Sequence, residues 1–183
     1  MKRITIYIVF ALLCLNFRVK AQSSIKEIKP LQVGSKLPES YWQLSLATIN
    51  SIGQKDILQL NSVKGKHQLI AFWACWCGSC ITKFSFLDSI QQQYGAKLKV
   101  IPVNTLKTGD TEQRIQDLIS GNRHKHISLK MPTVIGDSVM DNYFPHTSVP
   151  YYVWIDNKGM VKAITMSVLL KAQNIKMFLE DEL

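Results

Sequence analysis

Apolar residues along the chain fall into two patterns, short continuous runs and longer runs at helical spacing. Residues 68–72 form a short, nearly all-apolar run, which is typical of a central strand covered on both faces. Between residues 78 and 94 apolar side chains recur at helical spacing, at Ile81, Phe84, Leu87, Ile90 and Tyr94. Gly95 then provides a natural stop. The pattern therefore predicts a strand that leads directly into a helix.

The middle of the chain predicts a second strand and a second helix. Residues 97–103 have the composition of a strand. Residues 110–113 resemble a capping box, which would open a helix that ends at Gly121. Ahead of both, residues 30–46 contain glycine and proline, and we expect short extended pieces there.

The last third of the chain predicts a hairpin and a closing helix. Residues 133–135 indicate a short strand and residues 138–144 a short helix, with Asp137 near its start. Residues 151–155 have the strongest β propensity in the chain. A turn separates them from a return strand at 160–165, and a closing helix is expected at 167–180.

The order of these elements predicts an α/β fold. Strands joined through helices favour parallel pairing, and the final hairpin adds an antiparallel edge. The expected architecture is a mixed central β-sheet with helices on both faces. The 183 residues are enough for one domain with a substantial core.

The N-terminus has the composition of an export signal. Lys2 and Arg3 precede residues 4–15, a mostly apolar run without charge, and Val19 and Ala21 place an apolar and a small residue at the two positions that a signal peptidase reads. A 12-residue helix would reach about 18 Å, short of the roughly 30 Å hydrocarbon core. We therefore predict a signal peptide at residues 1–21, cleaved near Ala21. An uncleaved N-terminal membrane anchor is the alternative.

Two further expectations follow from this start. Lipidation of Cys14 is disfavoured because the residue before it, Leu13, is not small. Residues 22–30 are predicted to be a flexible lead-in, and residues 31–183 a single domain. The protein is then expected in the periplasm or another extracytoplasmic compartment.

The charge balance gives no indication of nucleic-acid binding. The chain carries a formal net charge of +9, and the predicted signal holds four basic residues and no acid, which leaves +5. No run of Lys or Arg remains.

The cysteine pattern points to redox chemistry or metal binding. The predicted mature chain keeps three cysteines, Cys75, Cys77 and Cys80, all within six residues. They are not a disulfide framework spread through a small fold. Cys77 and Cys80 have the spacing of a dithiol that can open and close at the start of a helix.

The thiolate is the reactive form of cysteine, and a helix N-terminus stabilises it. We therefore expect the Cys77 thiol to have a lowered pKa and to attack a partner disulfide. Cys80, one turn into the helix, is expected to resolve the mixed disulfide.

Residues 72–74 and 76–80 resemble the active-site segment of thioredoxins, most closely that of the exported TlpA-like oxidoreductases. The resemblance covers roughly residues 31–180 and includes a second landmark, Val149–Pro150 before the strand at 151–155. It implies a thioredoxin-like fold with a cis Pro150. It also implies that the Val149 backbone pairs with an extended substrate near Trp76. An insert of about residues 122–146 precedes this landmark.

The resemblance also implies an activity. It suggests a thiol–disulfide oxidoreductase that acts on exported proteins as a reductant, fed by a membrane electron-donor protein and without a cofactor. Oxidant and isomerase activity are the alternatives, as is a binding module without turnover. Trp73, Gly78 and Ser79 are expected to shape the site.

The sequence departs from the thioredoxin pattern at three positions near the dithiol. Ser79 replaces a common proline, which should shift the redox potential. Ala71 stands where thioredoxins have a buried aspartate, so that proton relay is missing or another acid supplies it. Cys75 replaces the Thr, Ser or Glu of relatives, either as a small side chain or as a partner in a non-productive disulfide.

Other interpretations of the dithiol fit the sequence less well. A purely structural disulfide would not need these flanking residues. Haem attachment is excluded because Ile81, and not histidine, follows Cys80. Zinc would need about two more ligands, and the candidates His124 and His126 lie in a basic polar loop. We therefore expect no metal.

Overall fold

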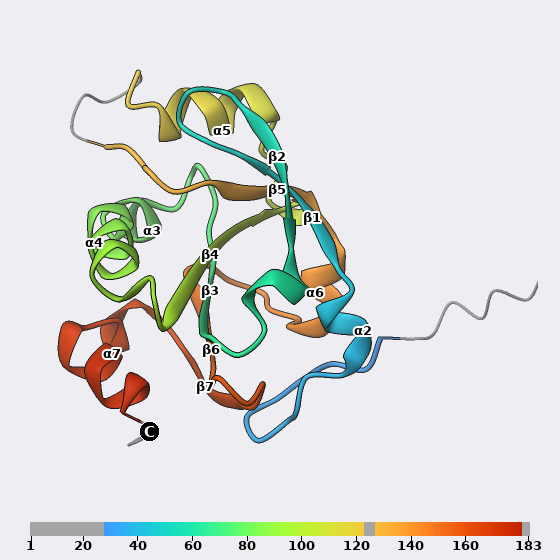
Figure 1. The fold of residues 1–183 in the computed structure, drawn as a ribbon. Coiled ribbons are helices and arrows are strands. Elements are labelled where there is room, and N and C mark those ends of the chain that lie inside the picture. Colours follow the sequence, from blue (N-terminus) through green and yellow to red (C-terminus); the bar gives the residue numbers. More distant parts are fainter. Residues whose placement is uncertain (1–27, 123–126, 181–183) are drawn as a thin grey trace, which may run out of the picture.

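A seven-stranded mixed sheet forms the centre of the computed structural model, which describes residues 28–122 and 127–180 (Figure 1). The strands are β1 (Ser45–Ile49), β2 (Lys55–Gln59), β3 (His67–Phe72), β4 (Leu98–Thr105), β5 (Thr133–Asp137), β6 (Tyr151–Ile155) and β7 (Val161–Thr165). The helices are α2 (Glu39–Trp42), α3 (Gly78–Ile81), α4 (Phe84–Tyr94), α5 (Glu112–Ile119), α6 (Val139–Tyr143) and α7 (Ala172–Leu179). Short 3-10 helices occupy Leu60–Val63, Leu106–Thr108 and Ser167–Leu169.

The strand order β2-β1-β5-β4-β3-β6-β7 places β3 near the middle of the sheet. β3 runs parallel to β4 and antiparallel to β6, and β4 runs parallel to β5. The pairs β1–β2, β1–β5 and β6–β7 are antiparallel. The predicted mixed sheet, its buried central strand and its terminal hairpin are therefore confirmed.

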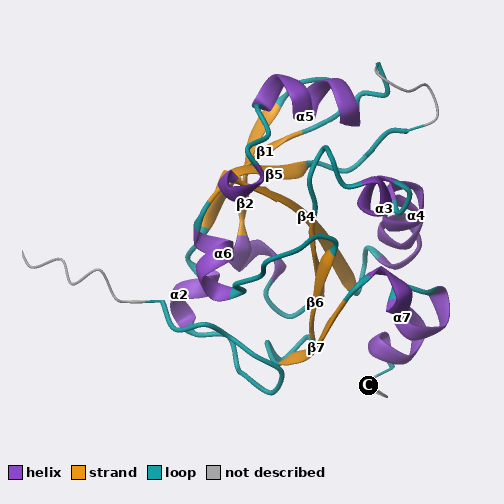
Figure 2. Cartoon of the chain, turned by 180° about the vertical axis from the view of Figure 1, so that it is seen from behind, coloured by secondary structure: helices purple, strands orange, loops and turns teal. Residues whose placement is uncertain are grey.

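Apolar side chains of β3 alternate between two cores, one on each face of the sheet. Leu69 and Ala71 join the core under α4, α5 and α7, and Ile70 and Phe72 join the core under α2 and α6. Figures 1 and 2 show the helices divided in this way between the two sides of the sheet. Because all six residues of β3 are buried, the strand is a fixed base for the segment that follows it.

The predicted helix at residues 78–94 is interrupted. α3 ends at Ile81, and α4 begins at Phe84. The Lys83 N–H donates to the Cys80 carbonyl, three residues back, and the Thr82 hydroxyl donates to the Ser79 carbonyl. These tighter i to i−3 contacts replace the regular helical ladder at this point. The first turn, which holds the cysteines, is thus a separate short element.

Three other sequence predictions need correction. The region 30–46 contains a short helix, α2, in addition to extended pieces. The hairpin of β1 and β2 was not predicted from the sequence. The closing helix at 167–180 is divided into a 3-10 turn and α7.

The start of α5 also differs from the predicted capping box. Thr111 is the N-cap, and its hydroxyl accepts a hydrogen bond from the Arg114 N–H at 3.2 Å. The Asp110 carboxylate takes no part in the cap and reaches the segment before Cys77 instead. The short strand and short helix predicted between residues 133 and 144 are confirmed as β5 and α6, with the Asp137 carboxylate accepting from the Met140 N–H at 2.7 Å.

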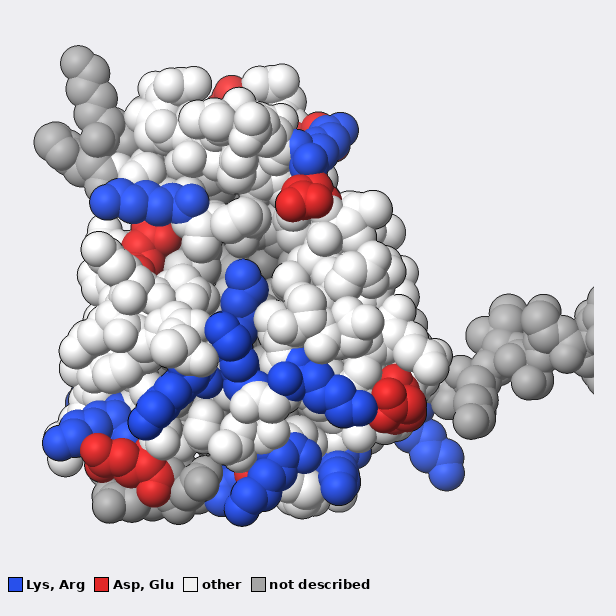
Figure 3. All heavy atoms as spheres, viewed as in Figure 1, with Lys and Arg blue, Asp and Glu red and all other residues white. Residues whose placement is uncertain are grey.

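The surface drawn in Figure 3 carries more basic than acidic side chains, and the basic ones gather in its lower half. Burial of Lys99, with a smaller contribution from the neighbouring charge of Lys66, lowers the pKa of the Lys99 ammonium.

No helix in the described ranges is long and apolar enough to cross a membrane. The predicted signal at residues 1–21 lies outside those ranges and stays a prediction.

Candidate active site

Cys77 and Cys80 form a disulfide at the start of α3, with their Cα atoms 5.3 Å apart. Cys77 is the N-cap residue of this helix. Its sulfur accepts a hydrogen bond from the Cys80 N–H at 3.2 Å and lies 3.6 Å from the Ser79 hydroxyl. These contacts place hydrogen-bond donors around the Cys77 sulfur, where they would stabilise a thiolate.

Exposure separates the disulfide from its neighbour Trp76. Cys77 is 5% exposed and Cys80 2%, whereas Trp76 is 58% exposed. The Trp76 indole N–H donates to the Thr108 carbonyl at 3.1 Å, which holds the ring against the loop after β4. Burial therefore does not distinguish the two cysteines, but the contacts to the Cys77 sulfur do.

A hollow of about 310 Å³ lies beside the disulfide segment and is lined by Trp76 and Val149. Lys107 and His146 also contribute to its walls. The Val149–Pro150 peptide bond is cis, as the resemblance implied. The structure thus brings together Trp76 and Val149, which are far apart in the sequence.

His146 fixes one wall of this hollow. Its ring stacks on Tyr151 with centroids 5.0 Å apart, and its Nδ1 lies 3.4 Å from the buried Asp141 carboxylate. Burial raises the pKa of Tyr151, and it raises the pKa of Tyr152 to about 12. Both phenols therefore stay protonated near neutral pH and are poor candidates for proton transfer there.

Trp73 and Gly78, which were expected to shape the site, and two positions that depart from the thioredoxin pattern, Ala71 and Cys75, lie close to the disulfide in the sequence. Trp73 is buried in the core, and its indole N–H donates to the Thr133 hydroxyl at 2.8 Å. A Cβ atom added at Gly78 would meet no atom within 4 Å, so no close contact requires glycine there. Ala71 is buried in β3, and Cys75 is buried and outside the disulfide.

The residues that hold the segment before Cys77 from the side of β4 were not predicted from the sequence. Asp110 accepts hydrogen bonds from the Cys75 N–H at 2.7 Å and from the Asn104 amide at 2.9 Å. The one signal available was an acid directly ahead of Thr111, because Thr111 can itself cap the helix and the Asp110 carboxylate is then not needed for the cap. His146 and Lys107 gave no comparable signal.

The described residues contain no group of three or more His, Cys, Asp or Glu side chains that could hold a metal ion. The zinc candidates His124 and His126 lie outside those residues.

Comparisons with known proteins agree with this geometry. The thioredoxin family model matches residues 52–117, which include both cysteines. The thioredoxin-like protein YneN of Bacillus subtilis is 26% identical over 152 residues, covering 83% of this chain and 82% of YneN. The thiol-disulfide oxidoreductase ResA of Bacillus cereus is 23% identical over 142 residues, covering 76% of this chain and 73% of ResA.

A solved structure supports the same fold. A thiol:disulfide interchange protein, DsbE, of Chlorobium tepidum superimposes with a TM-score of 0.57 at 23% identity, over 81% of this chain and 99% of that one. The fold and the site define a thioredoxin-like protein. Together with these relatives, the Cys77–Cys80 disulfide supports thiol–disulfide oxidoreductase activity for this chain.

Proposed function

We propose that this protein reduces disulfides in exported proteins, with Cys77 as the attacking thiol and Cys80 as the resolving thiol. The observation that carries the proposal is the position of the Cys77 sulfur, which receives the Cys80 N–H and lies near the Ser79 hydroxyl. Donors aimed at one sulfur favour its thiolate, and the thiolate is the nucleophile in thiol–disulfide exchange.

The reaction proceeds in two exchanges that conserve sulfur bonds. The Cys77 thiolate attacks one sulfur of the client disulfide, forms a mixed disulfide and displaces the other client sulfur as a thiolate. The Cys80 thiolate then attacks the Cys77 sulfur, forms the intramolecular disulfide and releases the second client thiolate. The client gains two electrons, the dithiol loses two, and the two client thiolates take up two protons.

The hollow beside Trp76 provides a place for the client chain. Val149 lines it and precedes Pro150, which has no N–H to offer near the sulfurs. We propose that the Val149 backbone pairs with an extended client segment while Trp76 covers the client cysteine. The site-shaping roles assigned to Trp73, Gly78 and Ser79 belong to the same proposal.

Replacing Trp76 by alanine should weaken client binding without unfolding the protein. Because Trp76 is exposed, the free energy of unfolding is expected to change by no more than about 1 kcal/mol. The KM for a disulfide-containing client should rise about three- to tenfold, with kcat changed less than twofold, since the lost contact is to substrate. Steady-state kinetics with oxidised insulin measure both, and an unchanged KM would contradict a client-binding role.

The exported setting belongs to the proposal as well. It is supported by the signal-like residues 1–21 and by the resemblance to TlpA-like oxidoreductases. An exported reductant needs electrons from outside its own compartment, so we propose a membrane electron-donor protein as its second partner. An oxidant or isomerase would instead pass its disulfide to the client or rearrange the client's bonds.

Trapping of the mixed disulfide tests the assigned roles. In Cys80→Ser the first exchange proceeds but the second does not, so the variant should accumulate a covalent adduct with a disulfide-containing client. Non-reducing electrophoresis should show this adduct for Cys80→Ser and not for Cys77→Ser, and Cys75→Ser serves as the matched control that turns over. An adduct that forms through Cys80 in Cys77→Ser, and not through Cys77, would reverse the assignment.

A further inference from the structure

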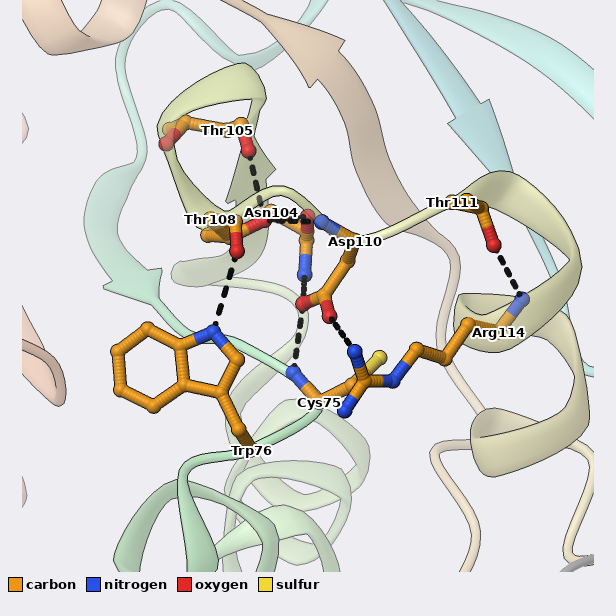
Figure 4. A network of polar contacts seen from close by, with 8 residues as sticks. All are labelled: Cys75, Trp76, Asn104, Thr105, Thr108, Asp110, Thr111 and Arg114. Carbon is orange, nitrogen blue, oxygen red and sulfur yellow. Dashed lines mark hydrogen bonds and ion pairs between the residues drawn. The ribbon is translucent and has the colours of Figure 1, made fainter.

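Asp110 places a buried carboxylate against the segment that directly precedes Cys77 (Figure 4). It lies in the loop between β4 and α5, and its side chain is 0% exposed. One carboxylate oxygen accepts from the Cys75 N–H at 2.7 Å. Since Cys75 is two residues before Cys77, chain geometry keeps this oxygen within about 12 Å of the Cys77 Cα atom.

The orientation of the Asp110 carboxylate is fixed by its other neighbours. The same oxygen also accepts from the Asn104 side-chain amide at 2.9 Å, and Oδ1 of that amide in turn accepts from the Thr108 hydroxyl. Thr108 also receives the Trp76 indole N–H on its carbonyl. The loop after β4 therefore holds the Cys75–Trp76 turn at two points, and Asp110 is the charged one.

The second Asp110 oxygen carries charge that is only partly balanced. It is buried and makes no hydrogen bond to any described residue. The Arg114 guanidinium on α5 lies 3.5 Å from this oxygen, and the Arg114 side chain is 44% exposed. A partly solvated arginine at this distance screens a buried carboxylate incompletely.

A structural role alone does not explain a carboxylate at this position. Thr111 caps α5, so Asp110 is not needed there. An asparagine would accept from the Cys75 N–H and the Asn104 amide equally well, because one carbonyl oxygen has two lone pairs. A buried charge costs more free energy than a buried amide, so its negative charge is the feature to be explained.

We propose that Asp110 is a positioning residue whose negative charge disfavours the Cys77 thiolate, and that Arg114 sets how much of this charge the dithiol experiences. The inference rests on the proposed role of Cys77 as the attacking thiol. The disulfide form has no thiolate, so the charge raises the free energy of the reduced form alone. The pair is thereby made a stronger reductant, because destabilising the reduced form lowers the redox potential.

The test uses charge changes that keep the shape of the site. Asp110→Asn removes the negative charge and keeps the acceptor oxygen, whereas Arg114→Gln removes the counter-charge. Glu112→Gln is the matched control, because Glu112 is a carboxylate in the same first turn of α5 that pairs with Lys55 in solvent. The balanced reaction is protein dithiol plus oxidised glutathione giving protein disulfide plus two reduced glutathiones.

Two quantities report the effect: the equilibrium constant with glutathione and the pH midpoint of Cys77 alkylation. Each should change in one direction for Asp110→Asn and in the opposite direction for Arg114→Gln. At pH 8 the equilibrium constant of this reaction should fall at least threefold for Asp110→Asn, which corresponds to a potential about 14 mV higher. It should rise for Arg114→Gln. The midpoint of the pH dependence of Cys77 alkylation should shift down for Asp110→Asn and up for Arg114→Gln, with Glu112→Gln unchanged in both.

A merely structural role would not produce shifts of opposite sign. If both variants shift the constant in the same direction, or if Asp110→Asn leaves it within 1.5-fold of the parent at unchanged stability, the inference is overturned. Failure of the proposed function looks different: the parent protein itself would be alkylated first at Cys80. That result would overturn the proposed roles, and this inference with them.

Discussion

Replacing Cys77 by serine is expected to lower the rate of insulin-disulfide reduction at least roughly 100-fold, to the rate of the reducing agent alone. The serine hydroxyl has nearly the shape of the thiol but ionises far less readily, so no nucleophile remains at this position. The Cys80 N–H and the Ser79 hydroxyl would still point at this site, but they would have no thiolate to stabilise. Turbidity of the insulin B chain measures the rate.

Cys75→Ser is the matched control for this loss of activity. Cys75 belongs to the same six-residue segment and is buried, but it lies outside the disulfide. Its replacement should therefore leave most of the reduction rate, and circular dichroism should show that both variants are folded. Equal rates for Cys77→Ser and the parent would contradict the assignment of Cys77.

Replacing Trp73 by alanine should lower the free energy of unfolding by about 3–5 kcal/mol. Trp73 is 2% exposed and packs edge-on against Phe84, with ring centroids 5.1 Å apart. Its removal leaves a large cavity between β3 and α4 and deprives the Thr133 hydroxyl of its indole donor. Urea unfolding followed by circular dichroism measures the change.

Trp73→Phe should cost less than Trp73→Ala. Phenylalanine keeps part of the ring contact with Phe84 but loses one of the two indole rings and the N–H to Thr133, so an intermediate loss of about 1–3 kcal/mol is expected. The Thr133 hydroxyl retains the Pro102 carbonyl as an acceptor, which limits the loss. A destabilisation of less than about 1 kcal/mol for Trp73→Ala would contradict the place of Trp73 in the core.

The part of the fold that carries the cysteines could be predicted from local patterns. β3 was recognisable because it is short and apolar on both faces, and this composition follows from its burial between two cores. The spacing of Cys77 and Cys80 and the Val149–Pro150 landmark also depend on neighbouring residues alone. For these features the sequence and the structure agree.

Two features of the fold were missed because the pattern of apolar side chains does not show them. β2 is mostly exposed, so its residues do not alternate clearly between apolar and polar, and the pairing of Leu46 with Leu58 defines it instead. The interruption between α3 and α4 comes from hydrogen bonds that the Thr82 hydroxyl and the Lys83 N–H donate to nearby backbone carbonyls, which the spacing of apolar side chains does not reveal.

Asp110 shows the same limit of local patterns within the site. Its sequence neighbours suggested a helix cap, whereas its partner is the Cys75 N–H, 35 residues away. The approach of these two segments follows from the parallel pairing of β3 with β4, which brings the carboxyl ends of both strands to one edge of the sheet. The sheet order therefore had to be known before Asp110 could be assigned to the site.

The equilibrium redox potential of the Cys77–Cys80 pair decides whether the protein is a reductant. It can be measured in glutathione or dithiothreitol buffers by counting free thiols with a maleimide label in a variant with both Cys14→Ser and Cys75→Ser, where only the pair carries thiols. A potential near about −270 mV is the expected result. A potential near about −120 mV would mean that the pair oxidises its clients and would contradict the proposed function.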